Sequence, residues 1–414
     1  MGALYTTLES CRVCGSHDFL DYLDLGKTPL ANSFLDPGKE NEEKTFPLKV
    51  LYCRKCSLSQ LNIVVNPSVL FSHYVYRSSI SKTFEQHCLR MAHNVASLIP
   101  PRDDSLVVDI ASNDGCLLKQ FKKIGYRVLG VEPAANIAVL ANSESIETLP
   151  SFWGEDVAQE IIRAKGKAAV ITATNVFAHI DNLQSFLQAV VTALDDNGLF
   201  IVEVPYLYHL ISHNEFDTVY HEHLSYFLVR PLHTLYQRNN FTIVRVEQHP
   251  IHGGSIRIFA TKTASKAFAV DSSVSQMLEF EKKNGLYDEK TYLDFAGRVN
   301  EMKQEMKNLL QDLKSQGKTI AGYGAPAKGN TLLNYFGIGH NLISFIADDT
   351  PEKQGKLTPG TRIPITGAHK LQEEKIDYIL LLAWNVAPEL MKKTSFHRGR
   401  GGKYIIPIPQ TQIV

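Results

Sequence analysis

Two pairs of cysteines restrict the fold of this chain more than any other feature of its sequence. Cys11 and Cys14 form one C-x-x-C unit, Cys53 and Cys56 form a second, and 38 residues separate the two units. One tight turn of this spacing presents two thiolates to a single metal, so two such turns complete a tetrahedral shell of four thiolates. We therefore expect one structural zinc ion per chain, in a closed site that stabilises a small module and does not catalyse.

Structural disulfides and a redox-active C-x-x-C unit are the two alternatives for these cysteines. A cytoplasmic setting disfavours structural disulfides, and neither pair lies in a thioredoxin-like context. Arg12, Arg54 and Lys55 lie among the four thiols, and we expect them to offset part of the negative charge of a zinc centre with four thiolate ligands. Cys88 and Cys116 stand alone, and we interpret both as buried apolar thiols.

Length and charge exclude several classes of protein. Because domains average roughly 150 residues, a chain of 414 residues predicts two to three of them. Lys+Arg and Asp+Glu both number 43, which argues against nucleic-acid binding through bulk positive charge and against a polybasic membrane binder. No apolar run approaches the roughly 18 residues of a membrane helix, and the first residues do not form a signal peptide. We expect a cytoplasmic protein without a nucleic-acid or membrane partner.

The central part of the sequence alternates between predicted strands and helices. Residues 106–110 form a short, continuous apolar run, which is typical of a strand buried on both faces of a parallel sheet. A turn over 111–115, a helix over 116–124 and a strand over 127–131 follow, and the strand ends on Glu132. Further strands are predicted over 168–172 and 199–204, with a helix over 183–194. This βαβ order predicts a doubly wound sheet with its site at the carboxyl ends of the strands.

A second βαβ unit is predicted near the C-terminus. It follows a long amphipathic helix over 290–315, whose apolar stripe is Tyr292, Phe295, Val299, Met302, Met306, Leu309 and Leu313. A strand over 319–323, a small-residue turn, a helix through Tyr335 and a strand over 343–347 ending on Asp348 then give a Rossmann-like pattern. Lys328, in the turn, suits a pyrophosphate, and Asn330 begins a helix whose amides favour anions. The alternative is that this turn only packs helix on strand.

The turn of the first βαβ unit is typical of a nucleoside site. Its small residues let a ligand approach the backbone, and Glu132 is placed to bind two ribose hydroxyls. The pattern lacks G-x-G-x-x-G and instead resembles motif I of class I S-adenosylmethionine-dependent methyltransferases, with Ala111 in place of the usual first glycine. A Rossmann-like domain for another nucleotide is the alternative. The expected cofactor-binding residues are Asp109, Ala111, Ser112, Asn113, Gly115, Glu132 and Asn175.

Histidines are concentrated in the segment Tyr220-His-Glu-His223 and at His179. Two histidines two positions apart do not share a helix face, and on a strand they supply only two metal ligands. A general acid/base cluster fits better, because imidazole has an ordinary pKa near 6.5 and a neighbouring carboxylate can fix its tautomer. We expect an apparent pKa of about 6–7 for this cluster.

These motifs occur in the same order in a family of sugar C-methyltransferases, which the chain resembles over essentially its whole length. The shared motifs are the two C-x-x-C units, Asp-Ile-Ala-Ser-Asn-Asp-Gly115, Tyr220-His-Glu-His-Leu-Ser-Tyr-Phe, Gly322-Tyr-Gly-Ala-Pro-Ala-Lys-Gly-Asn330 and Asp348-Asp-Thr-Pro-Glu-Lys-Gln-Gly355. The family, typified by the tetronitrose C3'-methyltransferase, contains zinc, uses S-adenosylmethionine and methylates C3' of nucleotide-linked 4-keto deoxysugars. The resemblance implies an α/β chain with a zinc module (1–65), a class I methyltransferase domain (66–288) and a Rossmann-like C-terminal domain (289–414) that binds the sugar nucleotide.

The resemblance also implies roles for individual residues. His223 matches the general base that removes the proton next to the ketone, after which the enolate attacks the sulfonium methyl; His179 is the rival base. Glu222 and Tyr220 line the reacting sugar, and Tyr74 or Tyr76 matches an active-site tyrosine. Lys328 and Asn330 are expected to bind the nucleotide, which is dTDP or GDP.

Two other functional classes remain as alternatives. One is an O- or N-methyltransferase, which would share the cofactor half of the site but needs no carbon base. The other is a zinc-ribbon binding protein on a Rossmann-like scaffold, which the zero net charge and the absence of a basic-aromatic stripe disfavour. The sequence is compatible with a monomer or a small homo-oligomer.

Overall fold

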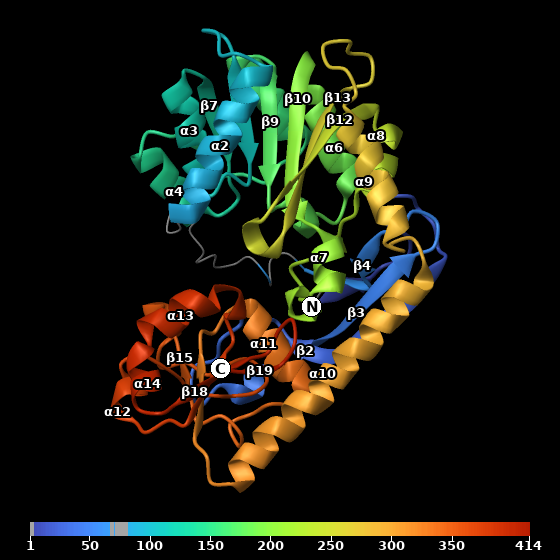
Figure 1. Ribbon diagram of the computed structural model, residues 1–414. Coiled ribbons are helices and arrows are strands. Elements are labelled where there is room, and N and C mark those ends of the chain that lie inside the picture. The colour runs from blue at the N-terminus through green and yellow to red at the C-terminus, as the bar shows by residue number, and fades with distance from the viewer. Residues whose placement is uncertain (1–3, 67–69, 71–81) are drawn as a thin grey trace.

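A seven-stranded sheet, which we call the central sheet because it lies in the middle of the sequence, occupies the upper half of the molecule in Figure 1. The computed structural model describes residues 4–66, 70 and 82–414, so Tyr74 and Tyr76 lie outside the described residues. The strand order is β12-β13-β10-β9-β6-β7-β8, with β13 antiparallel to both of its neighbours and the other pairs parallel. The bounds are β6 Leu106–Ile110, β7 Arg127–Val131, β8 Thr148–Leu149, β9 Ala168–Thr174, β10 Leu194–Pro205, β12 Phe241–His249 and β13 Ser255–Lys262.

Helices cover both faces of this sheet, as expected for a doubly wound fold. They are α2 Lys82–Leu98, α3 Cys116–Ile124, α4 Ala135–Ser143, α5 Glu155–Lys165, α6 Leu183–Ala193, α8 Val229–Arg238 and α9 Ser272–Lys283. The predicted bounds of β6, α3 and β7 are confirmed, because β6 is buried along its whole length and the turn before α3 is rich in small residues. The predicted strand at 199–204 is longer in the structure and begins at Leu194.

The N-terminal sheet contains a strand from the middle of the chain. Its order is β11-β4-β3-β2, with β2 Phe19–Pro29, β3 Thr45–Cys53, β4 Ser59–Leu61 and β11 Ser225–Tyr226. A separate pair joins β1 Tyr5–Thr7 to β5 Ile63–Val65. Because β11 begins two residues after His223, pairing of Ser225 with Gln60 fixes the histidine segment directly on the N-terminal part.

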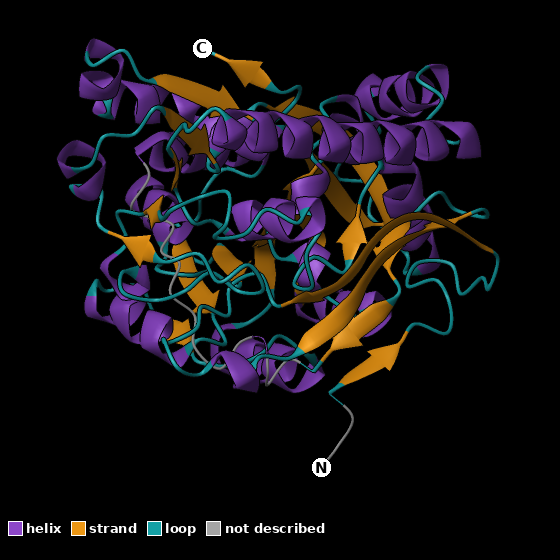
Figure 2. Cartoon of the chain, turned by 90° about the horizontal axis from the view of Figure 1, so that it is seen from below, coloured by secondary structure: helices purple, strands orange, loops and turns teal. Residues whose placement is uncertain are grey.

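A long helix, α10 Glu289–Ser315, runs along the molecule to the C-terminal sheet (Figures 1 and 2). It packs against the N-terminal sheet, where the Tyr292 ring lies 5.1 Å from that of Tyr22 on β2 and 4.3 Å from that of Tyr52 on β3, between centroids. Its stripe is buried as predicted except at one position, since Leu310 is buried and Leu309 is only half-buried.

The C-terminal sheet has the order β16-β15-β14-β17-β18-β19, parallel except for the last pair. Its strands are β14 Ile320–Tyr323, β15 Ile346–Ala347, β16 Ile365–Thr366, β17 Tyr378–Leu381, β18 Lys403–Ile406 and β19 Gln412–Ile413. Its helices are α11 Ala327–Phe336, α12 Lys370–Glu373, α13 Ala387–Lys393 and α14 Ser395–Gly399. The predicted second βαβ unit is therefore present, with a shorter second strand than expected. No helix among the described residues is long and apolar enough to cross a membrane.

Candidate active site

The four paired cysteines form one compact cluster of buried sulfur atoms. All four sulfurs lie within 4.8 Å of one another, with 3.6 Å between Cys11 and Cys56 and 3.5 Å between Cys14 and Cys53. Four Zn–S bonds of about 2.3 Å in a tetrahedron place the sulfurs roughly 3.8 Å apart. The donor set therefore fits zinc, and four protein ligands leave no position open for a reacting group.

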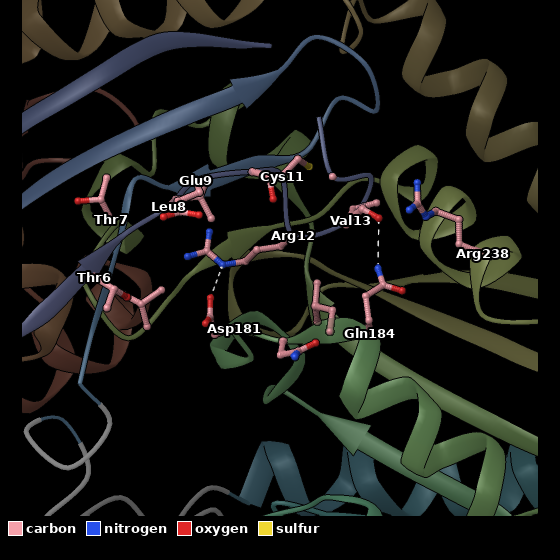
Figure 3. A pocket seen from close by; sticks show the side chains of 15 residues that line it. Thr6, Thr7, Leu8, Glu9, Cys11, Arg12, Val13, Asp181, Gln184 and Arg238 are labelled. Atoms are coloured by element: carbon pink, nitrogen blue, oxygen red, sulfur yellow. Dashed lines mark hydrogen bonds and ion pairs between the residues drawn. The ribbon is translucent and has the colours of Figure 1, made fainter. Parts of the chain in front are cut away.

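The two arginines of the cysteine turns bond to groups outside the cluster. Arg12 is buried and donates from Nε to Asp181 at 3.1 Å and from Nη1 to the carbonyl oxygens of Leu61 at 3.0 Å and Leu224 at 3.4 Å (Figure 3). Arg54 pairs with Glu289 of α10 at 2.6 Å. These bonds fasten the zinc module to its neighbours. The positive charge of Arg12 also interacts with Cys11, as expected for a residue that offsets part of the thiolate charge.

The hollow drawn in Figure 3 lies beside the zinc module and has a volume of about 510 Å³. It is lined by β1, by the first cysteine turn around Arg12, and by Asp181 and Gln184 near the start of α6. None of the residues expected to bind cofactor or to act on substrate lines it. The cofactor site therefore has to be built from the strand ends of the central sheet.

Glu132, at the end of β7, holds the turn that follows β6. Its Oε2 accepts a hydrogen bond from the backbone N–H of Asn113, and its Oε1 accepts one from Ala134, each at 2.9 Å. Burial raises the pKa of Glu132, and the two backbone donors oppose that shift. Each carboxylate oxygen keeps a second lone pair, so the group can still accept bonds from two ribose hydroxyls.

The turn itself is a tight cradle of small residues. Ala111 and Asn113 adopt left-handed backbone conformations, with φ of 55° and 50°. A Cβ at Gly130 would overlap Ser112 Oγ, which is buried and has no hydrogen-bond partner among the described residues. A close backbone approach, an unsatisfied hydroxyl and an acid at the next strand end fit the adenosine part of S-adenosylmethionine.

Two other expected cofactor residues differ in what they do in the structure. Asp109 lies within β6 and accepts a 2.6 Å hydrogen bond from Thr172 of β9, so it ties the two strands together. Burial raises the pKa of Asp109 to about 7. Asn175 follows β9 with a φ of 56°, and its N–H donates to the carbonyl of Glu203 at 2.8 Å. Asn175 therefore lies at the carboxyl edge of the sheet, as expected for a cofactor neighbour.

His223 is held through one ring nitrogen. Its Nδ1 lies 2.9 Å from the carbonyl oxygen of Thr218, and a carbonyl only accepts, so Nδ1 carries the hydrogen and Nε2 keeps its lone pair. The ring packs 4.1 Å from that of Tyr220 and 5.0 Å from that of His179 between centroids. The structure thus brings the side chains of His223, Tyr220 and His179 together, and their roles stay predictions.

The electrostatics of His223 differ from the sequence expectation. Burial lowers the pKa of His223 to about 3, and the charges of His179 and Lys328 act in the same direction, while the Thr218 carbonyl opposes them. Burial also lowers the pKa of His179. The expected apparent pKa of 6–7 is therefore too high for the ligand-free site, because that value belongs to a solvated imidazole. Burial therefore favours the neutral form of both rings.

Glu222 and His221 point to different neighbours. Glu222 is buried; its Oε1 accepts from Asn32 at 3.1 Å, its Oε2 has no partner among the described residues, and burial raises its pKa. His221 instead turns to the N-terminal sheet, where its Nε2 lies 3.1 Å from the Pro47 carbonyl and its ring packs on Phe46. Of the two histidines in this segment, only His223 therefore lies in the cluster formed with Tyr220 and His179, which we call the histidine cluster.

The C-terminal βαβ unit contributes Lys328 to this cluster. Its Nζ lies 4.6 Å from the centre of the Trp384 ring, and its charge acts on His223 and on Asp217. Asn330 is fully buried and donates to the carbonyl of Ala31 at 2.7 Å, which joins α11 to the N-terminal part. The assignment of both residues to nucleotide binding stays a prediction.

Asp217 and Trp384 complete the cluster, and the sequence analysis did not single them out. Asp217 is fully buried and accepts a 2.6 Å hydrogen bond from the Trp384 indole N–H. Two signals were available: Asp217 lies between Phe216 and the histidine segment that begins at Tyr220, and Trp384 is one of only two tryptophans in the chain.

The central fold, the strand-end cradle and the four-cysteine cluster define an S-adenosylmethionine-dependent methyltransferase with a zinc-binding module. Family models match three successive segments: a zinc binding domain at residues 11–71, a methyltransferase domain at 83–246 and a C-methyltransferase C-terminal domain at 250–409. C-methyltransferase NovU from Streptomyces niveus is 40% identical over 408 residues, which covers 98% of this chain and 97% of NovU. The chain belongs to this family of C-methyltransferases.

Two solved structures each match less than half of the chain. Magnesium protoporphyrin IX methyltransferase (ChlM) from Synechocystis PCC 6803 with bound SAM is 14% identical, covers 43% of this chain and 79% of its own, and gives a TM-score of 0.33. The YcgJ protein from Bacillus subtilis is 12% identical, covers 44% and 100%, and gives a TM-score of 0.35. The family assignment therefore rests on the full-length relative and the family models.

Proposed function

We propose that this enzyme methylates C3' of a nucleotide-linked 4-keto deoxysugar, with His223 as the base. The observation that carries the proposal is the geometry of His223: the ring is fixed through Nδ1, and Nε2 has no hydrogen bond among the described residues. A hydrogen on the carbon next to a ketone is acidic enough for such a nitrogen to remove when donors stabilise the enolate oxygen. Bound S-adenosylmethionine supplies the methyl group as an electrophile.

The groups around His223 suit this proton transfer. Tyr220 packs on its ring and His179 lies beside it, so both can donate to the ketone oxygen as negative charge develops there. The positive charge of Lys328 favours an enolate in the same region. Glu222, whose Oε2 has no partner among the described residues, is available to balance the imidazolium that forms. Tyr74 and Tyr76 keep their proposed place near the sugar as a prediction.

Proton exchange at the sugar carbon tests this function directly. In D₂O, the wild-type enzyme should exchange the C3' hydrogen of a dTDP- or GDP-linked 4-keto deoxysugar, whereas O- or N-methylation requires no such exchange. His223→Ala should slow exchange and turnover by about 10²–10⁴-fold while S-adenosylhomocysteine still binds. If His223→Ala exchanges at the wild-type rate and His179→Ala does not, the base is the other histidine.

The pH dependence has a defined sign. A histidine whose pKa is lowered stays neutral, and therefore able to accept a proton, at pH values below 6.5. Exchange should accordingly persist as the pH falls from 7 through 6 and decline only well below 6. A decline of exchange centred near pH 6.5 would show that His223 is solvated, or that another group is the base.

A further inference from the structure

A buried carboxylate next to the proposed base has no role in the chemistry described above. Asp217 lies in the short helix η4, Phe216–Thr218, and is fully buried. Its Oδ2 accepts the Trp384 indole N–H at 2.6 Å, whereas its Oδ1 is buried without a partner among the described residues. Burying a carboxylate is costly unless it is paired and hydrogen-bonded, and burial raises the pKa of Asp217 to about 6.

One peptide bond joins this carboxylate to the group that holds the base. The residue after Asp217 is Thr218, whose carbonyl oxygen accepts the Nδ1–H of His223 at 2.9 Å. The Thr218 hydroxyl in turn donates to the carbonyl of Glu215 at 2.8 Å, which closes η4 on itself. The ring of His223 therefore follows the position of η4, and a shift of Asp217 moves the carbonyl that fixes the tautomer.

The hydrogen-bond donor to the Asp217 carboxylate comes from the C-terminal part of the chain. Trp384 begins the short helix η7, Trp384–Val386, after β17, and Lys328 of α11 lies over its ring at 4.6 Å. The helix η4 also packs on α11, where the Phe216 ring lies 5.1 Å from that of Phe336. The Trp384 indole N–H thus forms a direct hydrogen bond between the C-terminal part and the segment that carries His223.

We propose that Asp217 and Trp384 form a positioning pair through which the C-terminal part fixes the ring of His223 for proton abstraction. The inference rests on the proposed role of His223 as base. Neither residue needs to touch the reacting carbon, because the pair acts through the Thr218 carbonyl. Lys328 contacts the same indole, so a phosphate bound at Lys328 lies next to the pair that orients the base.

Trp384→Phe is the sharpest variant, because it keeps an aromatic ring under Lys328 and removes the indole N–H, at the cost of some ring volume that the Trp153→Phe control also loses. Asp217→Leu removes the acceptor and keeps the branching of the side chain, and Asp217→Asn restores an oxygen that can accept the indole N–H. Trp153→Phe is the matched control, since the Trp153 indole donates to the Phe186 carbonyl at 3.2 Å, away from the cluster.

Small misplacements of a catalytic group lower the rate rather than the affinity. With a dTDP-linked 4-keto deoxysugar, Trp384→Phe and Asp217→Leu should reduce kcat and C3' exchange about 10- to 100-fold. KM and the affinity for S-adenosylhomocysteine should stay within about twofold, and Asp217→Asn and Trp153→Phe should remain close to wild type. A rise in KM at unchanged kcat, or an equal loss in Trp153→Phe, would overturn the proposal.

A spectroscopic measurement separates this inference from the proposed function. Nitrogen-15 NMR of labelled histidine reports which ring nitrogen of His223 carries the hydrogen, whatever the chemistry of the enzyme, and His223→Ala assigns the signal. The wild type should show the Nδ1–H form, and Trp384→Phe and Asp217→Leu should show a mixture of tautomers. An unchanged tautomer in both folded variants overturns the positioning pair, whereas wild-type exchange in His223→Ala overturns only the assignment of the base.

Discussion

The two βαβ units of this chain hold their turns by the same arrangement of hydrogen bonds. In the first, Glu132 accepts from the backbone N–H groups of Asn113 and Ala134 at 2.9 Å each. In the second, Asp348 accepts from Ala325 at 2.6 Å and from Thr350 at 2.8 Å. One bond ties the acid to the preceding turn, and the other ties it to the residue two positions later. In both units, the acid that follows the second strand therefore stabilises the turn that follows the first strand. Contact with a ligand would be a second role of the same acid.

The surroundings of the two acids differ. Lys353 places its Nζ 3.7 Å from Asp348 and donates to the Ala325 carbonyl at 2.9 Å, so the second acid has a cation beside it. Glu132 forms no ion pair among the described residues, and burial raises its pKa. The turn before the first acid spans five residues, 111–115, and that before the second spans three, 324–326. The longer turn and the uncompensated carboxylate suit hydroxyl donors, whereas the shorter turn presents Lys328 for an anion.

Removal of zinc should have the largest effect on the yield of folded protein. It should leave the first βαβ unit, which contains Glu132, intact. Structural zinc contributes apparent binding energies of about 10–16 kcal/mol in small zinc-dependent modules, so Cys11→Ser should greatly reduce the yield of folded protein and of activity. Cys88→Ala, outside the cluster, is the control. Because the cofactor residues make no bond to the four sulfurs, S-adenosylhomocysteine should still bind to any folded Cys11→Ser protein. Metal analysis without zinc, or native thiols oxidised in pairs, would contradict the site.

Replacing each of the two acids by alanine distinguishes stabilisation of the turn from contact with a ligand. Both Glu132→Ala and Asp348→Ala remove two backbone hydrogen bonds, but only Glu132 is proposed to bind ribose. Hydrogen bonds to a charged group contribute roughly 1.5–3 kcal/mol, so Glu132→Ala should weaken S-adenosylmethionine binding about tenfold or more. Calorimetry should show unchanged cofactor affinity in Asp348→Ala. Equal affinity in both variants would mean that the ribose lies elsewhere.

Much of this architecture could be predicted from the sequence because local patterns determine it. The apolar run of β6, the small residues before α3 and the acid after β7 follow one another within a short segment, so their bounds could be read residue by residue. The four-cysteine cluster was predictable because few arrangements satisfy two closely spaced thiol pairs. The error at Leu309 has a similar origin: over 27 residues, a small drift in helix phase moves the buried position to its neighbour.

The active site was less predictable because its parts come from distant segments. His223 and Tyr220 were visible as a local cluster, but the partner of Asp217 lies 167 residues away in sequence. Arg12 was interpreted from its neighbours in the chain, whereas its bonds go to Asp181 and Leu224, which only the fold brings close. The lowered pKa of His223 likewise depends on burial by several elements, and the sequence carries no direct signal of it.

Lys328 tests whether the second unit binds the anionic part of the substrate. Lys328→Ala should raise KM for the sugar nucleotide about three- to fivefold, because a half-buried ion pair contributes up to about 1 kcal/mol. Its matched control is Lys370→Ala, which removes another lysine that lies over an aromatic ring, Phe345, at 4.8 Å. Cofactor affinity should not change in either variant. An unchanged KM in Lys328→Ala would support the alternative that the turn only packs helix on strand.

The smallest expected effect concerns the first residue of each turn. Ala111 and Gly324 both directly follow a strand and both have positive φ, 55° and 85°. An L-residue in the left-handed region costs roughly 1–2 kcal/mol, and glycine adopts it freely but loses about 0.5–1 kcal/mol of backbone entropy on folding. Ala111→Gly should therefore raise the free energy of unfolding by about half a kcal/mol. Gly324→Ala should lower it, because its new Cβ would also lie 2.9 Å from the Ala383 Cβ. Urea unfolding of both variants measures whether the free energy of unfolding rises or falls. A loss of stability in Ala111→Gly would show that packing of the Ala111 side chain contributes more than the strain of its backbone costs.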